Sequence, residues 1–127
     1  MVRIVATITM LAVTFAAAVF TQPPPDPARA AGITVMRAVN TAEAAARQQS
    51  GKYLLLPDLI NHAMFARVRA DIVANGDVIT YRGQQLRVTL SADGLQYQAM
   101  VVPAETCGTA TFSDERGLIY TGKVLDC

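Results

Sequence analysis

Residues 28–50, ARAAGITVMRAVNTAEAAARQQS, decide how the chain is organised. The stretch is rich in alanine and has no proline, which is typical of a long helix. Its apolar residues recur at steps of three and four, which predicts one apolar face along that helix. That face comprises Val35, Met36, Val39, Ala42 and Ala46, and the polar residues Arg37, Asn40, Glu43 and Arg47 mostly take the other side.

Both ends of this helix have typical boundary residues. Asp26 and Pro27 favour a helix start, because an Asp side chain caps the first backbone N–H groups and Pro fits the first turn. Gly51 favours a helix end. Glu43 and Arg47 lie one turn apart, so we expect an ion pair worth only a few tenths of a kcal/mol.

A second, shorter helix is predicted over residues 57–74. Pro57 and Asp58 favour its start, and Asn75-Gly76 its end. Apolar residues spaced by four form a stripe along it: Ile60, Met64, Val68 and Ile72. The alternative is that its second half is irregular.

From Val78 onward apolar and polar residues alternate, as expected for strands with one buried face. Residues 82–84 are predicted to form a turn, and Asp93-Gly94 predicts a hairpin. The predicted strands cover residues 78–81, 86–90, 95–101, 109–112 and 118–121. The fold class expected is therefore α+β: an N-terminal signal or anchor helix, then a long α-helix packed on a four- to five-stranded antiparallel meander sheet.

The N-terminal segment is typical of an exported protein. Arg3 precedes an uncharged, mostly apolar run over residues 4–20, about 17 residues against the roughly 20 that a membrane span needs. Small residues at 16–18 and 28–30 offer two cleavage sites, and an uncleaved anchor with Arg3 in the cytoplasm is the alternative. The expected organisation is 1–20 signal peptide or membrane anchor, 21–29 proline-rich linker, and 30–127 globular domain.

The two cysteines of the chain, Cys107 and Cys127, both lie near the C-terminus. An even count in an exported protein favours a disulfide, which would close a loop of about 20 residues. Their spacing is not Cys-x-x-Cys, and no further metal ligand lies near them in the sequence.

Composition and motifs argue against several classes of function. The chain has 127 residues and a net charge of +1, which predicts one domain and argues against a nucleic-acid binder. His62 is the only histidine, and a lone histidine is usually a surface or satisfied core residue. Asp114 is expected to cap a turn rather than act with Glu115 as an acid–base pair. We therefore predict no catalytic, cofactor or metal-binding residues, and no enzymatic activity.

Several stretches of the chain together carry a resemblance to a known family. Residues 37–43, RAVNTAE, are followed by Gly51-Lys52-Tyr53 and Leu59; residues 96–104, QYQAMVVPA, are followed by residues 111–119, TFSDERGLI. These stretches resemble the helix-to-loop passage and the last strands of type IV pilins and type II secretion pseudopilins. A pattern that ends the sheet in that family maps here to Phe112, Asp114, Gly117 and Ile119.

The resemblance covers most of residues 30–127 and implies a pilin-like globular domain. It implies a non-enzymatic structural or interaction protein of the bacterial cell envelope, such as a minor pilin or secretion-system component. Its expected partners are other envelope, pilus or secretion subunits, and the inner membrane if the N-terminal segment stays uncleaved. The expected location is the periplasm, the periplasmic side of the inner membrane or the cell surface.

The chain also departs from the family pattern. Pilins carry a glutamate near the start of an almost continuous apolar helix, whereas residues 4–20 contain no acidic residue and are followed by a proline cluster. The resemblance therefore extends to the globular domain alone. The alternative function is a freestanding periplasmic binding module, which predicts a concave apolar pocket for a small ligand or peptide.

Overall fold

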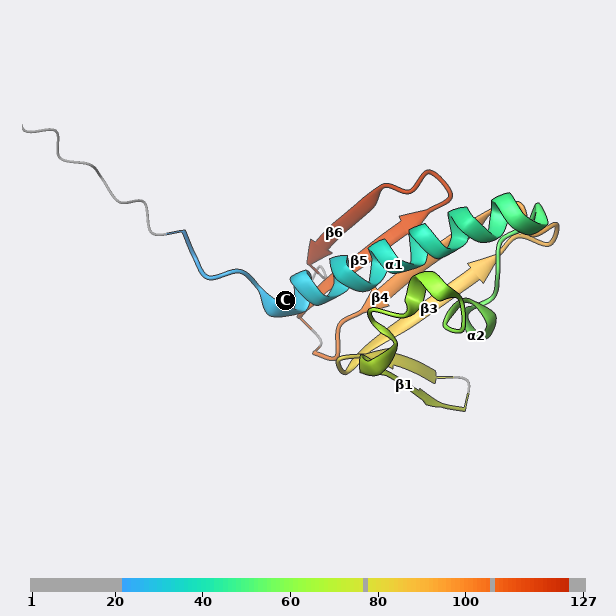
Figure 1. Ribbon diagram of the computed structural model, residues 1–127. Helices are drawn as coiled ribbons and strands as arrows, with labels where there is room; N and C mark the ends of the chain where they lie inside the picture. Colours follow the sequence, from blue (N-terminus) through green and yellow to red (C-terminus); the bar gives the residue numbers. More distant parts are fainter. Residues whose placement is uncertain (1–21, 77, 106, 124–127) are drawn as a thin grey trace, which may run out of the picture.

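The computed structural model describes residues 22–76, 78–105 and 107–123. One long helix, α1 (Pro27–Ser50), lies across one face of a six-stranded antiparallel sheet (Figure 1). The strands pair in sequence order: β1 (Ile72–Asn75), β2 (Val78–Tyr81), β3 (Gln84–Leu90), β4 (Tyr97–Val102), β5 (Thr109–Asp114) and β6 (Ile119–Lys123). The predicted α+β class, with a long helix on a meander sheet, is confirmed, although the sheet has more strands than the four to five expected.

The boundaries of α1 follow from its capping residues. The Asp26 carboxylate accepts a hydrogen bond from the backbone N–H of Ala28 at 2.9 Å, and Pro27 occupies the first turn. At the other end Gly51 adopts a left-handed conformation, with φ of 78°, and its N–H donates to the carbonyl of Arg47. Only a residue without a Cβ adopts this conformation at no steric cost, so the helix ends here. Both predicted ends are confirmed.

The core lies between α1 and the inner face of the sheet. All five residues of the predicted apolar face are buried, from Val35 to Ala46. Four of them, Val35, Met36, Val39 and Ala42, belong to one core cluster with alternate residues of β2, β3 and β4: Ile79, Tyr81, Leu86, Tyr97, Ala99 and Val101. The helical and the alternating periods thus meet in one core, as the sequence pattern predicted.

The predicted helix over residues 57–74 is wrong. A single helical turn, α2 (Leu56–Leu59), is followed by two short 3₁₀ segments, η1 (Ala63–Phe65) and η2 (Arg69–Asp71), and then by β1. Of the expected stripe, Val68 is buried but Met64 is 51% exposed. Leu59 and Phe65, which lie outside that stripe, are buried instead.

Side-chain hydrogen bonds explain why this irregular path is stable. The Arg69 guanidinium donates to the carbonyls of Ile60 and His62, at 3.0 and 2.9 Å, and so satisfies backbone groups that a continuous helix would pair internally. The residues expected to end the helix instead form the edge strand β1, which pairs with β2. This strand is the main reason why the sheet is larger than predicted.

Several predicted features fall on residues that the structure does not describe. They are the export segment over residues 4–20, the cleavage site at 16–18, and Cys127. Among the described residues, no helix combines the length and the hydropathy that crossing a bilayer requires.

Gly32 permits a close approach between α1 and β5. A Cβ at this position would collide with the Thr111 hydroxyl and lie 3.2 Å from the Thr111 Cβ, so rotating the threonine side chain would not relieve the contact. Thr111 is itself fully buried on β5. The helix can therefore lie this close to β5 only with glycine at position 32.

We expect Gly32→Ala to destabilise the fold by roughly 1–3 kcal/mol, because the added methyl overpacks the interface between helix and sheet. Urea unfolding measures the change. The double variant Gly32→Ala/Thr111→Ala should recover part of the loss, since it removes the colliding hydroxyl but keeps the Cβ of residue 111. Without the collision, Gly32→Ala should stabilise the helix by about 1 kcal/mol, because alanine has the higher helix propensity. A Gly32→Ala variant at least as stable as the wild type would therefore contradict the collision.

Candidate functional site

The sheet face turned away from α1 carries an exposed apolar row. Met100, Phe112 and Tyr120 are direct neighbours on β4, β5 and β6, and we call them the outer-face row. Met100 is 42% exposed and Tyr120 46% exposed, and the rings of Phe112 and Tyr120 have centroids 6.3 Å apart. Arg87 on β3 pairs with Met100, so one end of the row is cationic.

The chemistry of this row suits contact with another protein. Adjacent Met, Phe and Tyr side chains on a sheet provide apolar contact area, and these residue types are enriched in protein interfaces. Contiguous exposed apolar residues are typical of interaction sites, whereas single scattered ones are common on any protein surface. The outer-face row is therefore the first candidate for a functional surface.

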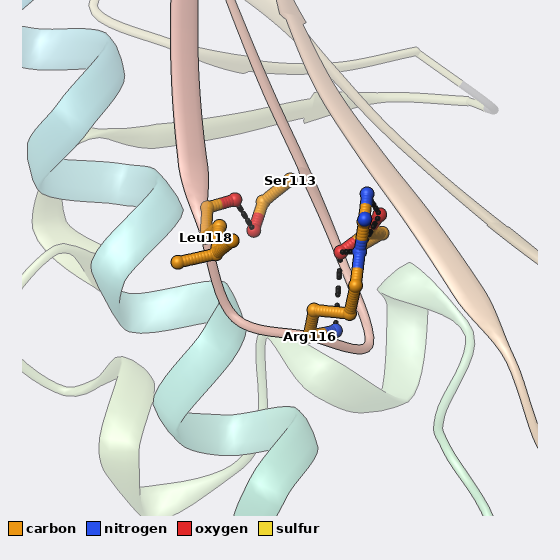
Figure 2. Close-up of polar contacts among 4 residues, drawn as sticks. Ser113, Arg116 and Leu118 are labelled. Carbon is orange, nitrogen blue, oxygen red and sulfur yellow. Dashed lines mark hydrogen bonds and ion pairs between the residues drawn. The ribbon is translucent and has the colours of Figure 1, made fainter.

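The β5–β6 turn, next to this row, is shaped by Asp114. One oxygen of its carboxylate accepts from the backbone N–H of Arg116 at 3.1 Å, and the other accepts from the Arg116 guanidinium at 2.6 Å. Figure 2 shows this turn, in which the Ser113 hydroxyl donates to the Leu118 carbonyl at 2.8 Å. The hydrogen bonds from Arg116 lower the pKa of Asp114. The predicted capping role of Asp114 is confirmed.

The same turn is held against α1 by a long-range polar link. The Asn40 side chain on α1 donates to the Gly117 carbonyl at 3.1 Å and accepts from the Tyr97 hydroxyl at 2.8 Å. Gly117 has a φ of 72°, a conformation that favours glycine. One asparagine thus joins the helix, β4 and the β5–β6 turn.

The four residues of the family pattern therefore lie in one hairpin but do different things. Phe112 belongs to the outer-face row, whereas Ile119 packs against the core from the inner face. Asp114 and Gly117 shape the turn between them. The geometry gives all four a structural reason to be present.

Glu43 was predicted to lie on the polar side of the long helix, but the structure buries it. Its side chain is 0% exposed; one carboxylate oxygen accepts from the backbone N–H of Leu54 at 2.9 Å, and the other has no hydrogen-bond partner in the described part of the chain. Burial raises the pKa of Glu43 to about 7, and the Leu54 N–H opposes this shift. A carboxyl in this position changes charge near neutral pH.

The expected ion pair between Glu43 and Arg47 is wrong. The Arg47 guanidinium instead lies over the Tyr53 ring, 5.8 Å from its centroid. Glu43 is next to Ala42 on the flank of the apolar face, where the segment after α1 folds back and presents the N–H of Leu54. Helical spacing alone favoured an exposed pair, because nothing in residues 28–50 reveals this returning segment.

Two tyrosines complete the surroundings of the buried carboxyl. The Tyr53 and Tyr97 rings meet edge to face with centroids 4.8 Å apart. Burial, with a smaller contribution from the charge of Glu43, raises the pKa of Tyr97 well above its ordinary value. The cluster is thus a set of buried polar groups that hold α1, the segment after it and β4 together.

A groove of about 590 Å³ lies at the start of α1, and its lining includes Asp26, Arg82, Glu105, Cys107 and Lys123. The Asp26 carboxylate accepts from the Thr109 hydroxyl at 2.8 Å, and this hydrogen bond is the main cause of its lowered pKa. The groove therefore combines charges of both signs with apolar residues such as Ala31 and Pro103. Because Cys127 lies outside the described residues, the disulfide with Cys107 stays a prediction.

His62 and Asp71 have local structural contacts. His62 begins η1, where its Nδ1 accepts from the N–H of Met64 at 3.3 Å, and Asp71 forms an exposed ion pair with Arg82 at 3.0 Å. Within the described ranges, no three His, Cys, Asp or Glu side chains are grouped so that they could hold a metal ion.

No protein-family model, curated protein or solved structure matches this chain. The resemblance to pilins and pseudopilins therefore rests on the sequence stretches that suggested it.

We expect the stability of the protein to fall as the pH rises from about 4.5 to 7. Glu43 releases its proton near pH 4.5 when unfolded but only near pH 7 when folded, so the stability that its neutral form contributes is lost across this window. The loss should amount to about 3 kcal/mol. Chemical denaturation at a series of pH values measures it.

Glu43→Gln is the control for this dependence, since a neutral amide of similar shape should remove most of the slope between these pH values. An unchanged slope in Glu43→Gln would show that another group is responsible.

We also expect Asn40→Ala to cost roughly 2–3 kcal/mol of stability, because it removes two hydrogen bonds and leaves the Tyr97 hydroxyl without this acceptor. Thr41→Ala is the matched control, since the Thr41 hydroxyl bonds only to the Arg37 carbonyl of its own helix. In a double-mutant cycle, Asn40→Ala and Tyr97→Phe should be coupled by about 1 kcal/mol. Additive effects in this cycle would contradict the proposed link.

Proposed function

We propose that this protein is an exported, non-enzymatic structural or interaction protein of the bacterial cell envelope, related to type IV pilins and type II secretion pseudopilins. In this role it is a minor pilin or a secretion-system component that contacts other envelope subunits. The observation that carries the proposal is the outer-face row of Met100, Phe112 and Tyr120 on a sheet whose opposite face is covered by α1.

The rigidity of this surface supports a role in docking. The row lies on three adjacent strands, and the β5–β6 turn beside it is held on α1 through Asn40 and Gly117. A surface that is ordered before it meets a partner loses less conformational entropy on binding. The apolar segment over residues 4–20 supports export, since it follows Arg3 and contains no charge.

A freestanding periplasmic binding module is the second candidate, favoured by the groove at the start of α1. Its lining combines the acidic Asp26 and Glu105 with the basic Arg82 and Lys123, a combination suited to a zwitterionic small ligand or peptide. A thermal-shift screen with amino acids and short peptides tests this role. A rise in melting temperature that Asp26→Asn and Lys123→Gln abolish would favour it over the first candidate.

Site-specific photo-crosslinking in the producing bacterium tests the proposed function. A photoreactive phenylalanine analogue at position 112 or 120 should yield crosslinked products that mass spectrometry identifies as pilus or secretion subunits, because these positions lie in the docking surface. The same analogue at Gln48, exposed on α1, is the matched control and should yield few such products.

Phe112→Ser should lower the yield of crosslinks from position 120 by about tenfold, the loss expected for an apolar interface side chain. Equal yields from positions 112, 120 and 48 would argue against the outer-face row as the docking surface.

A further inference from the structure

A second surface, more basic than the outer-face row, lies on the side of the sheet that α1 covers. A groove of about 460 Å³ runs between α1 and the segment that contains η1, with Arg37 and Arg67 in its lining. We call it the Arg37–Arg67 groove. The segment that follows α2 lies beside α1, on the side of the sheet opposite the outer-face row (Figure 1). An occupant of this groove would leave the outer-face row uncovered.

The hydrogen-bonding groups of the groove are almost entirely cationic donors. The hydroxyls of Thr34 and Thr41 donate to the carbonyls of Ala30 and Arg37 in their own helix, at 2.9 and 2.8 Å. Neither the Arg37 nor the Arg67 guanidinium has a hydrogen-bond or ion-pair partner among the residues that the structure describes. The polar groups left for an occupant are therefore two guanidiniums, which prefer carboxylates in a bidentate geometry.

The rest of the lining is apolar and small. The lining includes the buried Val68, three alanines, and Met64, which is 51% exposed. A flexible methionine beside small side chains adapts to an inserted apolar group. The lining thus favours an occupant that carries an apolar side chain near its negative charges.

The positive charge of this groove is not balanced locally. Its lining contains no acidic residue within the described part of the chain. Glu43, the acidic residue of α1, is buried on the core side, and Asp71 pairs with Arg82. The two exposed guanidiniums are therefore available to a negatively charged occupant.

We propose that the Arg37–Arg67 groove binds an acidic peptide segment of a partner protein, in which an apolar side chain inserts beside Met64 and flanking carboxylates pair with Arg37 and Arg67. A peptide segment fits better than a compact solute, because the groove is open along two neighbouring chain segments and offers separate apolar and cationic contacts. This binding does not depend on the proposed envelope function, since it uses the opposite side of the molecule.

Selection from a phage library of random 12-residue peptides against the exported full-length protein tests the proposal. Enriched peptides should carry two acidic residues around an apolar one. The affinity of the best peptide, measured by calorimetry, should fall by about tenfold or more in Arg37→Glu/Arg67→Glu. Both ion pairs are lost, and the new glutamates repel the acidic residues of the peptide.

A matched charge reversal provides the control for this experiment. Arg29→Glu/Lys52→Glu changes net charge equally at exposed positions outside the groove and outside the outer-face row, and the peptide should bind it within about twofold of the wild-type affinity. Both double variants replace exposed side chains, so each should fold. Circular dichroism spectra that match the wild type check this.

Three outcomes would overturn the proposal. One is selection without enrichment of acidic residues, and another is equal loss of affinity in the two charge-reversed variants. The third is a different occupant, shown either by sedimentation of a dimer that only Arg37→Glu/Arg67→Glu dissociates or by flotation of the wild type alone with phosphatidylglycerol vesicles. A dimer would assign the groove to a second copy of this chain, and flotation would assign it to an anionic lipid surface.

Discussion

The close packing of α1 on the inner face of the sheet is the constraint on which the other features of this protein depend. Val35, Met36 and Val39 are completely buried in that interface, and Gly32 lets the helix approach Thr111 where any side chain would collide. Burial of such side chains is the main favourable contribution to folding. The same contact fixes which side of the sheet remains exposed.

This packing also turns polar residues at the flanks of α1 into internal connectors. Asn40 reaches both Tyr97 and the turn at Gly117, and Glu43 accepts a hydrogen bond from Leu54. Asn40 thus gives the buried Tyr97 hydroxyl an acceptor, and Glu43 gives the partly buried Leu54 N–H an acceptor. The helix is therefore held by a set of directional contacts as well as by its apolar face, and those contacts define its position along the strands.

The two candidate surfaces follow from the same two-layer arrangement. Because α1 covers only one face of the sheet, the row of Met100, Phe112 and Tyr120 stays accessible on the other. On the helical side, a groove with cationic and apolar residues in its lining remains between α1 and the irregular segment after α2. One surface is apolar and aromatic and the other is basic, so they suit partners of different chemistry.

The sequence by itself determined the features that depend on neighbouring residues. Asp26 and Gly51 bound the long helix, Gly94 allows the β3–β4 hairpin to turn, and Asp114 caps the last turn, because each acts on backbone groups within a few positions. The alternation after Val78 likewise placed the inner face of the sheet.

Only the tertiary structure decided the features that depend on segments far apart in the chain. The burial of Glu43 requires the returning N–H of Leu54, and the irregular path after α2 requires Arg69 to bond the carbonyls of Ile60 and His62. The edge strand β1 exists because β2 offers it unpaired backbone groups. Local periodicity carries no information about such partners, since burial and hydrogen bonding at these positions are set by what the folded chain brings alongside them.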